Sequence, residues 1–416
     1  MPNGPHEARI RAFLDGERDV QAAFLAELVK VPSDNPPGDC RPHAERAAEL
    51  LERLGFVVER HPVPGDQARA NGMAGATNLV VRRRFGEGGP VVALNAHGDV
   101  VPPGEGWTVD PYGAEVVDGW MYGRGVAVSK SDFATYAWAL RALEASGAPL
   151  AGAVELHFTY DEEAGGNIGP GFLLREGVSR PDLAVSAGFS YGVTTAHNGC
   201  LHLEVEVNGK SAHAAMPHTG VDALEAANHV LSALYARRKA LARRTSAVPG
   251  IGGPQLTVGL IKGGINTNVV PDRVTFRLDR RMIPEERPAG VEAELRSAIA
   301  EAAAAFPEAK VEVRRILLVE PLAPLPGGER LTELLCRRGT EVMGEPVRPR
   351  GVPLYTDAPH YASRGIPTVL YGAGPRTIEE ANAHRADERL PLADLRKATE
   401  VVALALLDLL APGRPA

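Results

Sequence analysis

The chain has 416 residues, of which 44% are hydrophobic and 23% are charged, and its formal net charge is −7. This length and ordinary composition predict two or three domains that can bury large cores. Because the chain is mildly acidic and has no long basic block, we expect neither nucleic acid nor a membrane as its main partner.

The three cysteines, Cys40, Cys200 and Cys336, are widely spaced and form no CxxC pair. They are typical of reduced thiols in a cytoplasmic protein and give no zinc-finger pattern. The start, MPNGPHEARI, has no apolar run of the kind found in secretory signals, and VVALALLDLL is too short to span a membrane. We therefore expect a cytoplasmic protein.

Helical and strand-like segments alternate in the first part of the chain. Helical periodicity covers residues 20–31 and 45–54, and the glycine turn in GRGVAVSKSD leads into a further helix. Apolar runs of strand length are FVVER, NLVVRRR, VVALNA, GAVELHFTY and LAVSA. This alternation predicts an α/β layer structure.

The pattern changes after Gly199. LHLEVEVNG alternates strictly, and it is followed by a helix over 221–241, two strands, a helix over 289–306 and the strand KVEVRRILL. This order is the ferredoxin-like split βαβ arrangement, which leaves one sheet face uncovered by helices. An open face or edge invites pairing with a second copy, so we expect a homodimer.

Alternation of helices and strands resumes after about Glu320, with GIPTVLYG as a strand and a last helix over 391–410. The simplest account is a discontinuous α/β domain, 1–198 and 319–416, interrupted by an inserted α+β dimerisation domain, 199–318.

Two motifs at predicted strand ends carry groups suited to metal chemistry. In LNAHGDVVP, His97 and Asp99 point to the same face, where the histidine could bind a metal while the carboxylate orients its ring. In FTYDEEAGG, Glu162 and Glu163 point in different directions, so one could bind metal and the other act as a general base. A solvated His–Asp pair and an acidic surface loop are the alternatives that these motifs leave open.

Taken together, these segments and others along the chain resemble the peptidase M20 family of co-catalytic zinc aminoacylases and carboxypeptidases. This is the family of acetylornithine deacetylase, succinyl-diaminopimelate desuccinylase and glutamate carboxypeptidase. The resemblance rests on NAHGDVVPPGEGWTVDPYGAEVVDGWMYGRG, TYDEEAGG, AHNGCLHLEVEVNGKSAHAAMPHTGVDA, NTNVVPD, LDRR and YGAGPRTIEEANAHRADE. It implies a three-layer catalytic domain of zinc-exopeptidase type with an inserted dimerisation domain.

The resemblance also implies roles for individual residues. His97, Glu163 and His384 would be metal ligands, Asp99 would orient His97, and Glu162 would be the general base.

Three residues of the inserted segment receive roles in the same way. His213 would reach across the dimer into the partner's site, and Asn268 and Arg281 would hold the carboxylate of the substrate, for which the planar donors of arginine are suited.

Two positions depart from the family pattern. Val128 stands where the resemblance expects an aspartate that bridges two metal ions, and Ala187 or Gly188 stands where it expects a second acid. Asp132, one helical turn beyond Val128, is the nearest acid that could compensate. Because the acids that would hold two ions together are missing, we expect one divalent ion per subunit, with zinc favoured and manganese, cobalt or iron as alternatives.

The favoured interpretation is a metallohydrolase that cleaves an amide C–N bond in a small carboxylate-bearing substrate, of N-acyl amino acid or dipeptide type. A second interpretation is a catalytically inactive, metal-poor relative that binds a small carboxylate. A third keeps the metal but hydrolyses a non-peptide C–N bond.

Overall fold

The computed structural model describes residues 4–413 and separates the chain into two compact units. Unit 1 comprises the chain up to Thr195, Pro324–Arg350 and the part from Thr356 on. Unit 2 comprises Ala196–Ala323 and Gly351–Tyr355. The segment predicted as an inserted domain, 199–318, lies within unit 2.

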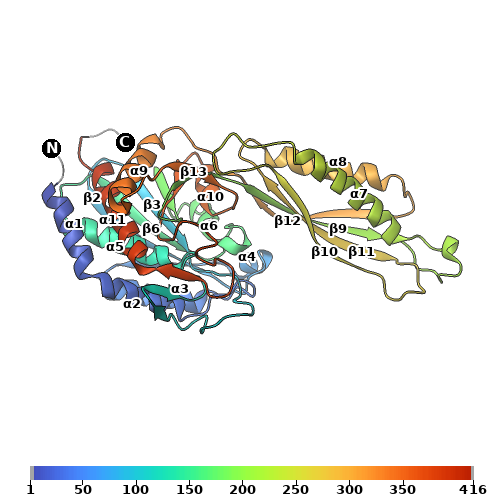
Figure 1. The fold of residues 1–416 in the computed structure, drawn as a ribbon, viewed down its shortest axis with the longest axis horizontal. Helices are drawn as coiled ribbons and strands as arrows, with labels where there is room; N and C mark the ends of the chain where they lie inside the picture. The colour runs from blue at the N-terminus through green and yellow to red at the C-terminus, as the bar shows by residue number, and fades with distance from the viewer. Residues whose placement is uncertain (1–3, 414–416) are drawn as a thin grey trace. The chain divides into compact units, whose positions relative to one another are not determined.

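Unit 1 is built on an eight-stranded sheet in the order β1-β2-β6-β3-β7-β14-β8-β13 (Figure 1). The strands, in that order, are Val58–Pro62, Thr77–Gly86, Gly152–Thr159, Val91–His97, Leu183–Ser186, Thr368–Leu370, Val193–His197 and Pro349–Val352. Strand β3 runs parallel to β6 and β7, and β7 runs parallel to β14. The carboxyl ends of these four strands therefore meet at one edge of the sheet, where α/β proteins place their ligands.

Helices cover both faces of this sheet. On one face α5 (Lys130–Ala145) packs on β3 and β6 and contacts α11 (Leu392–Leu409), which in turn contacts α9 (Glu329–Met343). The helices α1 (Gly4–Gly16), α2 (Arg18–Val29) and α3 (Arg41–Arg53) contribute to the same core. Short helices α6 (Pro170–Arg175) and α10 (Ala358–Ala362) cover the other face. The predicted three-layer α/β class is confirmed.

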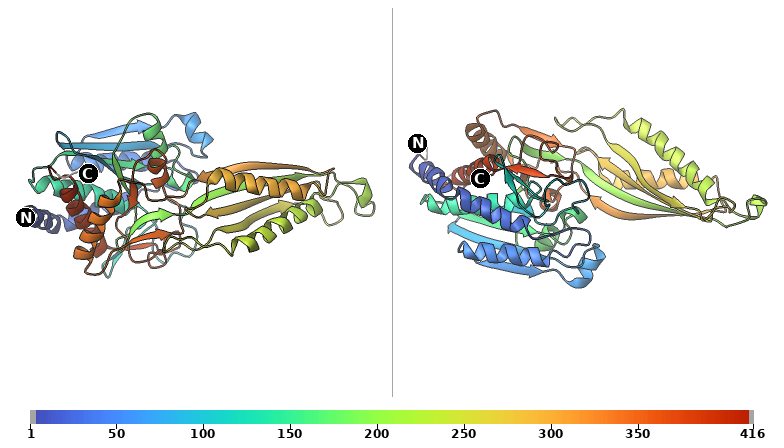
Figure 2. Two further views of the ribbon diagram at one scale, coloured as in Figure 1. Left: turned by 90° about the horizontal axis from the view of Figure 1, so that it is seen from above. Right: turned by 60° about the horizontal axis from the view of Figure 1, so that its bottom comes forward.

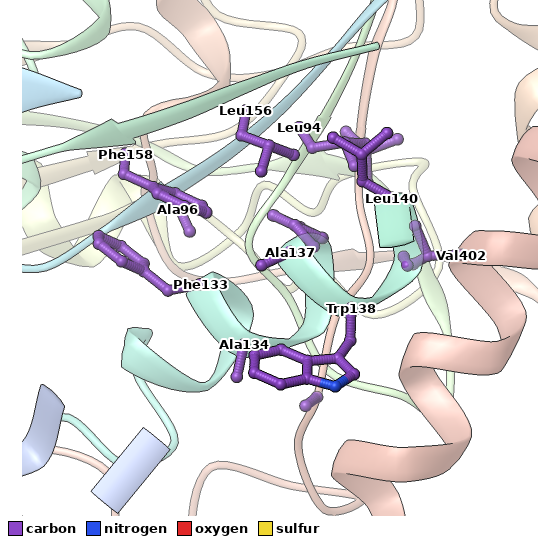
Figure 3. Close-up of a cluster of buried hydrophobic side chains, with 14 of the residues drawn as sticks. Leu94, Ala96, Phe133, Ala134, Ala137, Trp138, Leu140, Leu156, Phe158 and Val402 are labelled. Carbon is purple, nitrogen blue, oxygen red and sulfur yellow. The ribbon is translucent and has the colours of Figure 1, made fainter. Parts of the chain in front are cut away.

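The period of two along β3 explains how one strand serves both layers. Leu94 and Ala96 belong to the core beneath α5, whereas Ala93 packs in a separate cluster with residues of α6 and α10. Figure 3 shows the α5 side, where Phe133 stacks on Phe158 of β6 with ring centroids 4.0 Å apart. Strand β3, which ends in His97, is thus packed firmly from both sides.

A small three-stranded sheet, β15-β5-β4, joins distant parts of unit 1. Strand β15 (Arg389–Pro391) pairs with β5 (Trp120–Tyr122), which pairs with β4 (Val116–Val117). This pairing brings the segment that follows His384 beside the glycine turn that precedes α5.

Unit 2 is a four-stranded antiparallel sheet in the order β10-β11-β9-β12. Its strands are β9 (Gly199–Asn208), β10 (Gln255–Gly263), β11 (Arg273–Met282) and β12 (Lys310–Val319). The helices α7 (Ala223–Leu241) and α8 (Pro288–Ala303) cover one face of this sheet, as Figure 2 shows. Alternate residues of β9, from Leu201 to Val207, are buried beneath these helices. Cys200, His202 and Glu204 consequently point to the opposite face. The predicted β-α-β-β-α-β order is confirmed.

Between residues 4 and 413, no helix is both long enough and apolar enough to cross a membrane.

Candidate active site

The candidate site lies where the carboxyl ends of β3 and β6 adjoin. His97 is the last residue of β3 and pairs with Thr159, the last residue of β6. Glu162 begins a single 3-10 turn, Glu162–Ala164, immediately beyond β6. Parallel pairing therefore brings the two sequence motifs, LNAHGDVVP and FTYDEEAGG, to the same place.

The fully buried carboxylate of Asp99 organises this place. One of its oxygens accepts the backbone N–H of Glu162 at 3.2 Å, and the other accepts that of Glu163 at 3.1 Å. The side-chain amide of Asn35 donates to the same carboxylate at 3.0 Å. Asp99 therefore fixes the main chain of both predicted functional glutamates.

His97 is oriented mainly by a main-chain group. Its Nδ1 lies 3.0 Å from the carbonyl oxygen of Asp99 and 3.5 Å from the carboxylate of that residue. A carbonyl can only accept, so Nδ1 carries the proton and Nε2 is left as the nitrogen available to a ligand. Nε2 lies 4.0 Å from Oε2 of Glu162.

Burial and charge shift the pKa values of this pair. Burial by itself lowers the pKa of His97, but the negative charges of Glu162, Asp99 and Glu163 outweigh it and raise that pKa well above its usual value. Burial raises the pKa of Glu162 well above its usual value, an effect that the charge of His97 only partly opposes. Such a concentration of buried acid favours occupation by a cation.

Glu163 and His384 form a second pair. Oε1 of Glu163 lies 3.3 Å from Nε2 of His384, and this hydrogen bond is the main cause that raises the pKa of His384. The side chain of Glu163 is 7% exposed and that of His384 is 52% exposed. The structure thus brings the predicted residues together as two pairs, His97 with Glu162 and Glu163 with His384.

The three predicted metal ligands do not converge as tightly as a preformed metal shell. His97, Glu163 and His384 do not form a group whose candidate ligand atoms all lie within 4.8 Å of one another. Over residues 4–413, the group that does so is Cys200, His202 and Asp279 in unit 2. Two imidazoles and a carboxylate among buried acids nevertheless suit a divalent cation chemically.

The two positions that lack an acid are filled by apolar contacts and by tight backbone packing. Val128 and Ala187 are partly buried and pack against the main core of unit 1. At Gly188 an added Cβ would lie 2.9 Å from the backbone nitrogen of Tyr371, so no side chain fits there without a shift. Ala187 is therefore the position at which an acid could stand.

Asp132 is committed to the main chain. It is fully buried, and its two oxygens accept the backbone N–H groups of Gly188 at 3.1 Å and Ala373 at 2.8 Å. These residues follow β7 and β14, so the carboxylate ties the ends of two strands to the first turn of α5. Both oxygens of Asp132 are thus engaged by main-chain donors that hold the ends of two strands.

The sequence motifs did not reveal the role of Glu388. Its buried carboxylate accepts from Arg124 Nη1 at 2.7 Å and from the backbone N–H groups of Gly125, Ala127 and Val128, each at 3.1 Å. The loop that contains Val128 is therefore folded around this one carboxylate. The available signal was the arginine in the glycine turn, which needs an acidic partner if it is buried.

In unit 2, His213 and Asn268 lie on neighbouring loops. His213 forms a β-bridge with Val269, and the backbone N–H of Ala214 donates to the carbonyl of Asn268 at 3.0 Å. Nδ1 of His213 accepts the backbone N–H of Ala215 at 3.0 Å. In the neutral ring the proton therefore sits on Nε2, which is free to donate.

Arg281 stands near the opposite end of the same sheet. Its Nε donates to both oxygens of Asp279, at 3.0 and 3.2 Å, and its guanidinium lies over the ring of Tyr355 with a distance of 5.4 Å to the centroid. Arg273, the first residue of β11, lies at the end of the strand that is nearer to Asn268. From Arg273 to Arg281 the strand extends over about 27 Å. One small ligand therefore cannot contact both ends.

Comparison with known proteins defines the family. Residues 93–408 match the sequence model of peptidase family M20/M25/M40. Acetylornithine deacetylase of Erwinia tasmaniensis is 29% identical over 361 residues, which cover 84% of this chain and 86% of that protein. Succinyl-diaminopimelate desuccinylase of Gluconacetobacter diazotrophicus is 28% identical over 393 residues, which cover 91% of this chain and 94% of that protein.

A solved structure shows the same fold. An M20 metallo-carboxypeptidase from Sulfolobus solfataricus superposes with a TM-score of 0.77 over 94% of this chain and 99% of that chain, at 17% sequence identity. The chain belongs to peptidase family M20/M25/M40. It is therefore an enzyme of the class that hydrolyses C–N bonds, in a family whose members depend on divalent metal.

Replacing Glu388 should destabilise the loop around Val128. Glu388→Ala leaves the buried Arg124 without its ion-pair partner, and removing one member of such a pair typically costs about 3–5 kcal/mol. Denaturant unfolding measures this loss. Glu379→Ala, at an exposed position in the same segment, should cost less than about 0.5 kcal/mol. Equal losses for the two variants would contradict a stabilising role for the contacts of Glu388 with Arg124 and the loop, which we call the Glu388 clamp.

Asp132 should make the metal-free protein less stable as pH rises. Burial raises its pKa to about 7, so the folded chain binds this proton more tightly than the unfolded chain. The resulting stabilisation is complete below about pH 4 and is lost as pH rises through about 7. Asp132→Asn should reduce the slope of unfolding free energy against pH by up to about 1.4 kcal/mol per unit between these values.

Asp118→Asn is the matched control for that measurement, since it likewise removes one carboxylate but at an exposed position. An unaltered slope in Asp132→Asn would show that Asp132 ionises in the same range in the folded and unfolded chains.

Proposed function

We propose that the chain hydrolyses the amide bond of a small carboxylate-bearing substrate, of N-acyl amino acid or dipeptide type, with one divalent ion per subunit. The observation that supports this most is the arrangement held by Asp99. It holds the main chain of Glu162 and Glu163, while its carbonyl leaves Nε2 of His97 available as a ligand. A solvated His–Asp pair or an acidic surface loop would not be buried and cross-linked in this way.

Glu162 is the proposed general base. It takes the proton of the attacking water and can return it to the leaving amine. Burial raises the pKa of this carboxyl well above its usual value, which strengthens it as a base. His97, Glu163 and His384 would hold the ion, most suitably zinc. When bound, the ion supplies Lewis acidity at the scissile group.

The missing acids are the basis for proposing one ion. Two divalent cations placed side by side repel each other, and a carboxylate between them offsets that repulsion. Val128 and Ala187 provide none, and both oxygens of Asp132 are used by backbone N–H groups. A single ion requires His97 and the Glu163–His384 pair to draw together on binding.

Support for the substrate class comes from relatives and from one arginine. The matched relatives are named as deacylases of amino acids, acetylornithine deacetylase and succinyl-diaminopimelate desuccinylase. Arg281 offers a planar set of donors to a carboxylate, and its Nε is already held by Asp279, so its orientation is fixed before binding. Asn268 is the second proposed carboxylate contact.

The separation within unit 2 supports a homodimer. His213 and Asn268 lie at the far end of β11 from Arg281, so the proposed groups cannot all contact one small substrate from a single subunit. His213 of the partner subunit would donate its Nε2–H to the developing oxyanion.

Metal content should separate the role of Glu162 from those of the ligands. Elemental analysis after zinc loading should show one equivalent per subunit fewer in His384→Ala than in the unsubstituted protein. Glu162→Gln should keep the full metal content and lose at least about 100-fold in turnover on a panel of N-acetyl amino acids, because it removes the base without removing a ligand.

A difference of two equivalents between these proteins would instead indicate a dinuclear centre. No difference, together with no turnover of any N-acyl amino acid or dipeptide, would favour a non-catalytic carboxylate-binding protein.

Mixing two inactive variants tests whether His213 acts across the dimer. His213→Ala and Glu162→Gln should each be inactive, yet a heterodimer of the two has one subunit whose base is intact and whose partner supplies the histidine. At equal mixing, half of the dimers are of this kind and each has one complete site, so activity should recover to roughly a quarter of the original. If both groups had to come from one subunit, mixing would restore nothing.

A further inference from the structure

A second cluster of metal-ligating side chains lies in unit 2, beside Arg281, the proposed carboxylate contact. Cys200 and His202 are two residues apart on β9 and so point to the same face, away from α7 and α8. In the register with β11, His202 lies directly opposite Asp279 and Cys200 lies opposite Arg281. Antiparallel pairing thus places a thiol, an imidazole and a carboxylate side by side.

The three donor atoms converge. Sγ of Cys200 lies 3.3 Å from Nε2 of His202 and 3.9 Å from Oδ2 of Asp279, and Nε2 of His202 lies 2.9 Å from the same Oδ2. In a tetrahedral zinc shell with usual bond lengths, the corresponding separations are roughly 3.3–3.6 Å. Shifts of only a few tenths of an ångström would therefore adapt the cluster to an ion.

The geometry differs from that of a nucleophilic triad. In a triad the two nitrogens of the histidine face different partners, the nucleophile and the acid. Here the same nitrogen, Nε2 of His202, faces both the sulfur and the carboxylate. Such convergence on one point suits coordination of an ion and does not suit the relay of a proton.

The surroundings also suit an ion. Arg281 Nε donates to the carboxylate of Asp279 and so fixes it, as outer groups commonly do for metal ligands. The thiol is buried, whereas the side chains of His202 and Asp279 are 34% and 29% exposed, which leaves a route to the donors. A thiolate and a carboxylate would balance the two charges of a divalent ion.

We propose that Cys200, His202 and Asp279 bind one zinc ion with a fourth position open, separately from the catalytic ion of unit 1. The thiolate selects zinc over harder ions such as magnesium or calcium, which prefer oxygen ligands. Because three protein ligands leave a coordination position free, water or a small ligand can complete the shell.

Cobalt substitution tests this site directly, because a thiolate bound to cobalt gives a charge-transfer absorption that nitrogen and oxygen ligands do not. Titration of the full-length protein with Co²⁺ should produce this band at an intensity of one thiolate-bound ion per subunit once both proposed sites are filled, and Zn²⁺ should abolish it by displacement. Cys200→Ser should eliminate the band. His202→Ala should weaken cobalt binding by more than about tenfold at this site.

Cys40→Ser and Cys336→Ser are the matched controls, since each removes another free thiol and should leave the band intact. His384→Ala should leave it intact too, which separates this site from the ion of the proposed function. Failure of the band to appear at any excess of cobalt would mean that the three residues form a hydrogen-bonded cluster only. Persistence of the band in Cys200→Ser would likewise overturn the proposal. If Cys200→Ser does not fold, cobalt binding by His202→Ala, at a partly exposed position, provides the test.

Discussion

The acceptance of two consecutive backbone N–H groups by the carboxylate of Asp99 is the interaction on which the candidate site depends. It determines how the chain leaves β6 and therefore where the side chains of Glu162 and Glu163 project. The carbonyl of the same residue sets the ring of His97. A buried carboxylate without donors would be costly, so the three N–H groups that surround Asp99 also explain how it can be buried at all.

Sequence periodicity was sufficient for the layers and for the two motifs at the strand ends, because each depends on residues close together in the chain. The helix over 221–241 and the strictly alternating strand after Gly199 were predicted close to their observed bounds. The partners of Arg124 and Asp132 could not be predicted, since Glu388 lies 264 residues from Arg124 and Ala373 lies 241 residues from Asp132. The Cys200–His202–Asp279 cluster likewise depends on the register between two strands, which no local pattern determines.

The acids at this end of the sheet serve two different purposes. The carboxylates of Glu162 and Glu163 face neighbouring histidines. Those of Asp132 and Glu388 instead accept hydrogen bonds from backbone N–H groups. An acid near a metal site is therefore not necessarily available to the metal. The carboxylates that remain free of the main chain are therefore fewer than the count of nearby acids suggests.

The clamp formed by Glu388 has a genetic consequence. It holds the loop through backbone N–H groups, including that of Val128, and these bonds do not involve the side chain at position 128. Valine and aspartate codons can differ by one base, as can those of alanine and either acid at position 187. A carboxylate can therefore be introduced at position 128 by exchanging one side chain, on a loop whose main chain is already held in place.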